Sequence, residues 1–218
     1  MKIWNSLYLP DDEHHLIDWM QKAGEIVDGK PTYQYPKYRE ALKQCSQKRR
    51  VVDVGANLGL WSRVMLLDFQ HVEAFEPVEK HIECLLLNAP KANLYQVALG
   101  NEHGFVEMVT SGDSCGDTSP KSGVGKEVTV TKSVEMVLLD DYNFKNVDLI
   151  KIDCEGFELF VLQGAEKTII ENKPVIIVEQ KPNKGTKFGL SDTAAVDYLQ
   201  SLGMKIHTVL AGDYIMVW

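Results

Sequence analysis

Two acidic residues and two glycines at neighbouring strand ends have the types and spacing that bind a nucleoside. Asp53 lies in the apolar run 51–54, and Gly55 and Gly59 follow it after two and six positions. Gly55 allows a sharp turn that brings bare backbone against a ligand, and Gly59 allows the next helix to begin close to the sheet. Glu76 ends a second apolar run, where a carboxylate can accept both hydroxyls of a ribose.

The same spacing discriminates between nucleotide cofactors. The pattern D-x-G-x-x-x-G lacks a glycine of the pyrophosphate-binding G-x-G-x-x-G fingerprint, because Asn57 stands in its place, so NAD is disfavoured. A ribose site without a pyrophosphate site indicates S-adenosylmethionine (SAM), whose amine and sulfonium cations also suit acidic strand ends. Asp53 alone would fit a turn, and Glu76 alone would fit a solvated strand end. Their common register with two glycines favours the nucleoside.

A second group of carboxylates follows the apolar run 147–152. Asp153 or Glu155 could act as general base toward a hydroxyl nucleophile if partial burial raises its pKa. These carboxylates and Glu158 could instead bind the hydroxyls of a polyol, hold Mg²⁺, or open the next helix with charges that suit its dipole. A catalytic or substrate-binding role for Asp153 and Glu155 is favoured over helix capping. Mg²⁺ is the least favoured of these alternatives.

Other residues near these strand ends invite weaker assignments. Lys151 on a buried strand is expected to pair structurally with one of the acids. Glu179 and Lys181, after the run 175–178, are second-tier candidates for substrate contact and would equally suit a solvated strand end. Cys154, between two acids, would have a raised thiol pKa and make a poor nucleophile.

Alternating strand and helix patterns from residue 50 onward must position these groups. Strands are expected at 51–54, 72–75, 94–99, 147–152 and 175–178, and helices at 60–69, 79–88, 157–171 and from 191 to before 203. This alternation predicts a parallel sheet with helices on both faces. Two final strands, 204–209 and 214–218, predict a hairpin that adds one antiparallel edge strand.

The chain outside this alternation predicts two additions to the domain. Residues 1–49 read as an N-terminal helical cap, with helices near 11–28 and 37–47, ahead of a SAM-binding domain at 50–218. Runs at 105–110 and 127–134 predict an inserted β-hairpin. The glycine-rich loop 111–126 between them is either a substrate lid or disordered.

These motifs resemble the class I SAM-dependent methyltransferases and, within them, the FkbM family. The resemblance covers roughly residues 50–180, and its markers are VDVGANLG (52–59), AFEP (74–77), VALG (97–100), LIKIDCEGFE (149–158), Gly164-Ala165 and IVE (177–179). The segment Lys-Ile-Asp-x-Glu-Gly-x-Glu is the most family-specific of them. The resemblance implies a doubly wound, mostly parallel seven-stranded sheet and O-methylation of a hydroxyl on a sugar, glycan or other small molecule.

The resemblance also assigns positions around the cofactor. It places Asp53, Gly55, Asn57 and Gly59 around the methionine half and ribose of SAM, Glu76 on the ribose diol, and Pro77, Val97 and Ala98 beside the adenine. Many relatives carry an acidic residue at position 97 to receive the adenine amine. Val97 cannot do so, which leaves backbone groups or Asn101 for that contact. The expected product is S-adenosylhomocysteine (SAH).

Composition bears on the binding partners and the cellular location of the protein, and two alternative functions stay open. The formal net charge of −8 argues against a nucleic-acid surface, and the four cysteines form no C-x-x-C pair, as expected for reduced thiols. No signal peptide or membrane-spanning run is recognised, so a cytoplasmic protein is expected. The alternatives are a SAM-dependent methyltransferase acting on RNA or protein, supported by the basic run 48–50, and a non-catalytic methyltransferase-like binding module.

Overall fold

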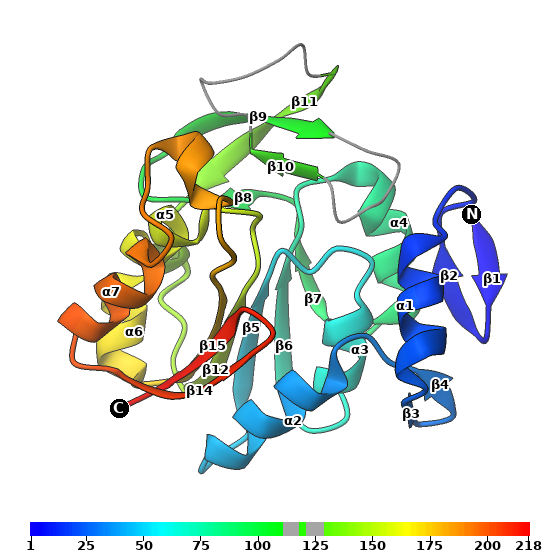
Figure 1. Cartoon of the computed structure of the whole chain (residues 1–218), viewed down its shortest axis with the longest axis horizontal. Coiled ribbons are helices and arrows are strands. Elements are labelled where there is room, and N and C mark those ends of the chain that lie inside the picture. The colour runs from blue at the N-terminus through cyan, green and yellow to red at the C-terminus, as the bar shows by residue number, and fades with distance from the viewer. Residues whose placement is uncertain (111–117, 121–128) are drawn as a thin grey trace.

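A central sheet of largely apolar strands organises the molecule. The structure is a computed structural model that describes residues 1–110, 118–120 and 129–218. In this part of the chain the sheet has seven strands in the order β14-β15-β13-β12-β5-β6-β7 (Figure 1). Their bounds are β5 Arg50–Val54, β6 His71–Phe75, β7 Asn93–Tyr95, β12 Val147–Ile152, β13 Val175–Glu179, β14 Lys205–Leu210 and β15 Asp213–Val217. The predicted doubly wound, mostly parallel sheet is confirmed.

The direction of the strands corrects one detail of that prediction. Strands β13, β12, β5, β6 and β7 are parallel to their neighbours in that series, whereas β15 pairs antiparallel with both β13 and β14. An antiparallel strand was expected at the edge of the sheet, but β15 lies inside the sheet, between β14 and β13. Burial explains the order, because Ile215 and Met216 of β15 are fully buried, while Ile206 and Val209 of β14 are exposed.

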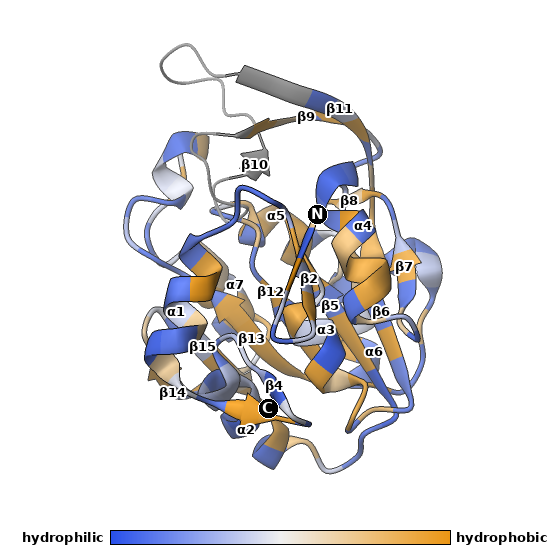
Figure 2. Cartoon of the chain, turned by 90° about the vertical axis from the view of Figure 1, so that its right-hand side faces the viewer, coloured by the Kyte–Doolittle hydropathy of each residue, from blue (hydrophilic) through white to orange (hydrophobic). Residues whose placement is uncertain are grey.

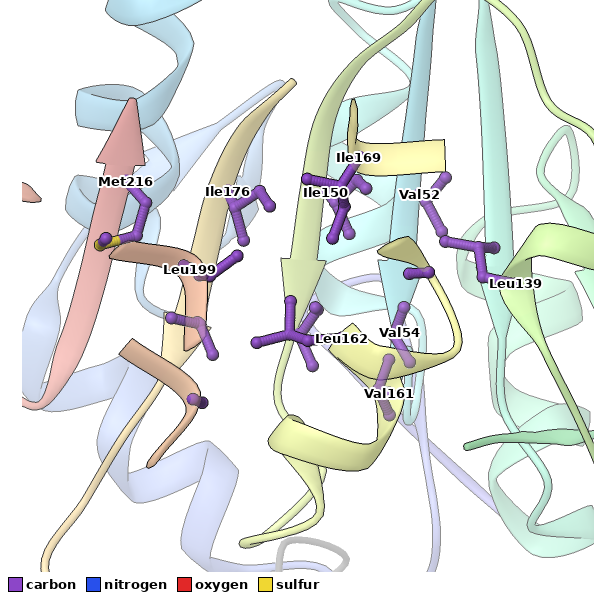
Figure 3. Packing of buried hydrophobic residues seen from close by; sticks show 14 of the residues in the cluster. Val52, Val54, Leu139, Ile150, Val161, Leu162, Ile169, Ile176, Leu199 and Met216 are labelled. Carbon is purple, nitrogen blue, oxygen red and sulfur yellow. The ribbon is translucent and has the colours of Figure 1, made fainter. Parts of the chain in front are cut away.

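Helices cover both faces of the sheet, because alternate residues of each strand point to opposite sides. One face carries α5 (Glu158–Gln163), α6 (Glu166–Asn172), α7 (Ala194–Ser201) and the short 3-10 helix η2 (Leu139–Tyr142). Figure 3 shows Leu162 and Leu199 of these helices packed near Ile150 and Ile176 of the sheet. A single helix was expected at 157–171. It divides at Gly164, where a Cβ would lie 1.8 Å from the Gly100 carbonyl oxygen.

The opposite face carries α2 (Tyr35–Gln44), α3 (Leu60–Met65) and α4 (Glu79–Asn88). Tyr38 of α2 and Trp61 of α3 pack with Val51, Leu149 and Ile177 of the strands. Hydropathy follows this layering: the strands of the sheet are mainly hydrophobic, and hydrophilic residues lie on the surrounding helices and loops (Figure 2). Apolar clusters on both faces confirm the expected sheet with helices on both sides.

The N-terminal region contains more than the helices expected there. It forms β1 (Lys2–Trp4), β2 (Leu7–Leu9), α1 (His15–Ala23), β3 (Ile26–Val27) and β4 (Lys30–Pro31) before α2. The four strands make two short antiparallel hairpins. Helix α1 ends at Gly24, which adopts a left-handed conformation (φ 66°), so the expected helix 11–28 is shorter. Leu9 and Leu16 of this region pack against Leu58 and Leu60, which brings it onto the β5–α3 connection.

A second sheet contains the inserted hairpin. Strands β9 (Gly104–Thr110) and β11 (Thr129–Val137) pair antiparallel, with β10 (Thr118–Pro120) and β8 (Ala98–Leu99) on either side. The single strand expected at 94–99 is thus two strands, β7 and β8, in different sheets. The proposed lid, 111–126, lies outside the described residues apart from β10. Within the described ranges, every helix is too short or too polar to cross a membrane.

Candidate functional site

A large cleft opens at the carboxyl ends of the parallel strands β5, β6, β12 and β13. The empty space in this cleft, including the solvent-filled space at its open mouth, is about 1070 Å³. Of the residues assigned from sequence, those in its wall are Gly55, Asn57, Glu76, Pro77, Val97, Ala98, Asp153 and Glu155. Asp53 and Gly59 are not in the wall. The structure thus brings together most of the assigned residues, including segments about 100 positions apart.

The turn after β5 requires glycine at position 55. Gly55 has a φ of 71°, and its N–H and that of Ala56 both donate to the Phe75 carbonyl at 3.0 Å. A Cβ on Gly55 would lie 2.0 Å from the Asp153 carbonyl oxygen. Only a residue without a side chain allows the β5 turn to pass this close to the end of β12, and the turn therefore presents bare backbone to the cleft.

Asp53 supports this turn from behind. Its side chain is fully buried, and its Oδ2 accepts a hydrogen bond from Ser62 Oγ at 2.6 Å. Its Oδ1 lies 3.4 Å from Lys151 Nζ, which donates to the Gly55 carbonyl at 2.8 Å. Burial by itself would lower the pKa of Lys151, but the negative charges of Asp53 and Asp153 outweigh this effect. The pKa therefore lies above its usual value, and the lysine stays charged. Lys151 Nζ also lies 4.0 Å from Asp153 Oδ2, so the expected pairing with one of the acids after β12 is confirmed, although Asp53 is the nearer carboxylate.

Gly59 also acts at the edge of the site. It begins α3 with a φ of 76°, and a Cβ there would lie 3.1 Å from Leu85 Cγ of α4. The glycine therefore lets α3 and α4 pack closely beneath the turn. Its role in the structure is to place α3, so any effect on a ligand is indirect.

Glu76 connects the ends of β5 and β6 and lines the cleft. Its Oε2 accepts the N–H of Asn57 at 2.8 Å, and its Oε1 accepts the N–H of Val78 at 2.9 Å. His81 Nδ1 lies 3.2 Å from the same Oε1. These contacts fix the carboxylate at the cleft wall, and each carboxylate oxygen has more than one lone pair for hydrogen bonding.

The wall beside Glu76 is mostly apolar. It includes Pro77, Val97, Ala98, Met108 and Phe157. Asn101, the alternative offered for an adenine contact, does not belong to it: its side chain is exposed, and its Nδ2 donates to Gln163 Oε1 at 3.0 Å. Asn101 follows two residues after β8, which ends at Leu99, and the structure does not bring its side chain into the cleft wall.

Three carboxylates meet at the other end of the cleft. Oxygen atoms of Asp153, Glu158 and Glu179 lie within 4.8 Å of one another. Glu158 does not line the cleft, and its Oε1 accepts the N–H groups of Cys154 and Gly156 at 2.9 and 3.0 Å. Burial raises the pKa of Glu158 to about 7 and that of Glu179 to about 8. The helix-opening role therefore fits Glu158, whereas Asp153 and Glu179 face the ligand space.

Lysines accompany the carboxylates that line this end. Glu155 pairs with Lys184, and Glu179 pairs with Lys181. Lys181 lies in the cleft wall with both glutamates. The result is a surface of alternating positive and negative groups. Burial raises the pKa of the neighbouring Cys154 thiol well above its usual value, as expected, so this thiol is not a nucleophile.

Residues that the sequence did not assign to the site also line it. Leu16 and Tyr33 reach it from the N-terminal region, and Trp61 reaches it from α3. Burial raises the pKa of Tyr33 to about 12, so its phenol remains protonated. The aromatic stretch between Pro31 and Pro36 was visible in the sequence, but its position over the cleft depends on long-range packing.

Comparison with known proteins identifies the family. The model described as the methyltransferase FkbM domain matches residues 53–206, which is more than half of the chain. The chain belongs to the FkbM family of methyltransferases. The resemblance seen in the motifs is thereby confirmed, and with it membership of the SAM-dependent methyltransferases. No curated protein sequence matches the chain.

Solved structures share the fold at low sequence identity. The FkbM methyltransferase from Methylobacillus flagellatus is 20% identical with a TM-score of 0.50, and the match covers 78% of this chain and 43% of that one. The precorrin-6y C5,15-methyltransferase from Geobacter metallireducens is 14% identical, with a TM-score of 0.49 and coverages of 86% and 89%. A TehB-like SAM-dependent methyltransferase from Corynebacterium glutamicum is 11% identical, with a TM-score of 0.48 and coverages of 93% and 96%. This FkbM-family chain thus spans less than half the length of the Methylobacillus protein.

The residues present fit SAM. The bare backbone at Gly55 gives the methionine half room, and the fixed carboxylate of Glu76 can accept ribose hydroxyls. The apolar wall near Pro77 and Val97 suits an adenine ring, and Asp153 offers a negative charge to the cationic half. The cleft therefore has groups that suit the methionine half, the ribose and the adenine of SAM.

Proposed function

We propose that this chain transfers the methyl group of SAM to a hydroxyl oxygen of a sugar, glycan or other small polar molecule. The observation that carries the proposal is the single cleft in which a nucleoside-type end and a carboxylate–lysine end adjoin. Gly55, Asn57, Glu76, Pro77, Val97 and Ala98 would hold SAM, with Asp53 and Gly59 supporting them from behind. When bound, SAM supplies a methyl group on a positively charged sulfur, which becomes neutral SAH after transfer.

The chain's own contribution is to position the acceptor. Asp153 and Glu155 lie in the wall at the carboxyl end of β12, where each can accept a hydrogen bond from an acceptor hydroxyl. The Lys184 ion pair restrains Glu155. Holding a hydroxyl oxygen at attack distance supplies a large part of the acceleration in such a displacement.

The alternating charges favour a polyol as the acceptor. Each hydroxyl of a sugar can donate to a carboxylate such as Asp153 and accept from an ammonium group such as Lys181. The negatively charged phosphodiester backbone of RNA would instead be repelled by Asp153, Glu155 and Glu179 in the cleft. The formal charge of the chain, −8, adds to this repulsion. Sugars therefore match the site better than RNA.

The same charges disfavour a divalent cation. Lys151 Nζ lies 4.0 Å from Asp153, and Lys181 pairs with Glu179. Two ammonium groups thus already face the carboxylates that would bind Mg²⁺ through oxygen. Glu158, the third carboxylate, accepts two backbone N–H groups.

Calorimetric titration with SAH tests the cofactor assignment. We expect micromolar binding of SAH, an equal result with and without Mg²⁺, and no binding of the control ligand NAD⁺. Transfer of tritiated methyl groups from SAM to a panel of methyl glycosides then tests the acceptor class. No SAH binding would overturn the proposal, and transfer only to RNA or protein would overturn its acceptor class.

A further inference from the structure

Glu179 is a buried carboxylate in the wall of the cleft, and one of its two oxygens has no hydrogen-bond partner among the described residues. It ends β13 and lines the cleft, although only 3% of its surface is exposed. Its Oε1 pairs with Lys181. Its Oε2 is buried and has no hydrogen-bond partner among the described residues. Buried polar atoms are nearly always paired, so an unpaired carboxylate oxygen beside a ligand space calls for a functional explanation.

We propose that Glu179 is the base that removes the proton from the acceptor hydroxyl during methyl transfer. The inference rests on the proposed function and gives the proton to a residue other than the two first assigned near the acceptor. Its Oε2 offers a lone pair that no group in the described part of the chain occupies, at the adjoining ends of β12 and β13. A general base needs such a lone pair within hydrogen-bond reach of the hydroxyl.

The neighbouring carboxylates are less suited to this task. Glu155 pairs with Lys184 as Glu179 does with Lys181, but 19% of its side chain is exposed against 3% for Glu179. Glu158 accepts two backbone N–H groups and does not line the cleft. Asp153 lines the cleft with 24% of its side chain exposed, so water competes for its oxygens. Asp153 is therefore placed to bind and orient the hydroxyl, while Glu179 receives its proton.

Burial and neighbouring acidic groups increase the affinity of Glu179 for a proton. Burial is the main cause of its raised pKa, and the charge of Asp153 is the next. Glu155 adds to the effect, and Glu158 contributes a third carboxylate within 4.8 Å of the group. Asp213 of β15 lies opposite Glu179 in the strand register. The pKa of about 8 lies near the neutral range in which a general base is most effective.

Positive groups around Glu179 limit this increase. Lys181, on the loop that follows β13, lowers the pKa of Glu179 by its hydrogen bond and charge. Lys184 follows on the same loop, and Lys151 lies behind Asp153. Lys37 of α2 neutralises Asp213 through an ion pair of 2.8 Å. The buried phenol of Tyr33, which stays protonated, completes the surroundings.

The step balances without any further reactant. An oxygen lone pair of the acceptor forms the new O–CH₃ bond, and the S–CH₃ bond breaks with its electron pair left on sulfur. The hydroxyl proton moves to Glu179 Oε2, which gives a neutral carboxylic acid. Lys181 positions the carboxylate through Oε1, and the proton later passes to solvent.

The test compares Glu179→Gln with the wild type and with Glu171→Gln, a control at an exposed glutamate that pairs with Lys145. The probes are tritiated SAM and the methyl glycosides of glucose, galactose, mannose and rhamnose. We expect Glu179→Gln to bind SAH like the wild type and to lower kcat by about 10²- to 10⁴-fold, while Glu171→Gln changes neither. Glu179→Asp should recover part of the rate, because it restores a carboxylate.

A second readout needs neither SAM nor turnover. Infrared difference spectra of the protein alone, recorded across the neutral and mildly alkaline range, report the C=O band of protonated carboxyl groups. We expect one such band to disappear near pH 8 in the wild type and in Glu171→Gln, and to be missing in Glu179→Gln.

The outcomes separate the two proposals. A wild type that binds SAH but methylates none of the glycosides defeats the proposed acceptor class, and the role of Glu179 fails with it. A wild type that is active, together with an equally active Glu179→Gln variant, overturns the role of Glu179 alone. So does an infrared band near pH 8 that persists in Glu179→Gln, or a rate that requires Mg²⁺ and shows no rise through this pH.

Discussion

The two ends of the cleft, which we propose to bind the cofactor and the acceptor, are built by different means. At the cofactor end, the β5 turn is fixed by backbone: Gly55 passes the end of β12, and Glu76 accepts two backbone N–H groups. At the acceptor end, the ends of β12 and β13 carry ionisable side chains, and burial raises the pKa of Glu158 and Glu179. Backbone geometry thus determines the structure of the first end, and interactions between charged side chains determine that of the second.

This difference teaches where the site should tolerate change. A backbone-determined turn loses its geometry when a single Cβ is added, and no change of pH restores it. A charge-determined cluster keeps its shape when a carboxylate becomes an amide, but its protonation changes. Substitutions at the cofactor end should therefore affect folding and binding together, and those at the acceptor end should affect the response to pH.

The largest effect is expected from Gly55→Ala. The new Cβ would meet the Asp153 carbonyl at 2.0 Å, so the β5 turn or the end of β12 must move. We expect the free energy of unfolding, measured with urea, to fall by about 4 kcal/mol, with loss of SAH binding.

Gly29→Ala is the matched control for this change. Gly29 has a φ of 70°, close to the 71° of Gly55, but no atom lies within 4 Å of its added Cβ. The backbone strain alone should lower the stability by about 1–2 kcal/mol and leave SAH binding intact. Equal losses in the two variants would show that strain, not the contact between β5 and β12, limits position 55.

The cofactor end could be predicted from sequence because its determinants are local. Asp53, Gly55 and Gly59 lie within seven positions, and the spacing alone specifies strand, turn and helix. What the spacing could not reveal was that Asp53 points away from the cleft, toward Ser62 and Lys151. That orientation follows from the pairing of β5 with β12, about 100 residues later.

The acceptor end was predicted only in part because it is assembled from distant segments. The proximity of Glu179 to Asp153 depends on strand order, and Tyr33 reaches the cleft from the N-terminal region. The place of β15 inside the sheet was missed for the same reason. Its signal was burial on both sides at Ile215 and Met216, which a hairpin pattern alone does not reveal.

A smaller effect at the cofactor end is expected from Glu76→Gln. The amide keeps one acceptor oxygen, but its NH₂ group would face a backbone N–H of Asn57 or Val78. It also removes the negative charge that suits ribose hydroxyls. We expect SAH affinity to fall about 10- to 100-fold by calorimetry, since an unpaired polar group costs about 1–3 kcal/mol.

Glu79→Gln is the control for this loss of charge. Glu79 is exposed, pairs with Lys132 and does not line the cleft. Its replacement should leave SAH affinity unchanged. If Glu76→Gln also bound SAH as the wild type does, the ribose assignment of Glu76 would be wrong.

The smallest effect is expected at the acceptor end, as a gradual change of stability with pH. The pKa of Glu158 is raised to about 7 and that of Glu179 to about 8, whereas an unfolded glutamate titrates near 4.3. Between these values the folded state holds protons that the unfolded state has released. The free energy of unfolding should therefore fall gradually as pH rises from about 5 to about 8, because only the protonated carboxyls are favoured by burial in the folded state.

Glu179→Gln separates the contributions of the two glutamates, because of this pair only Glu158 still titrates in the variant. Urea unfolding measured at intervals from pH 5 to pH 9 should show the decline ending near pH 7 in the variant and near pH 8 in the wild type. Gly29→Ala, which is remote from these charges, should shift the whole curve down without changing its slope. A wild-type curve that is flat between pH 7 and pH 8 would mean that Glu179 is already ionised there, and the contrast between a shape-determined and a charge-determined end would lose its main support.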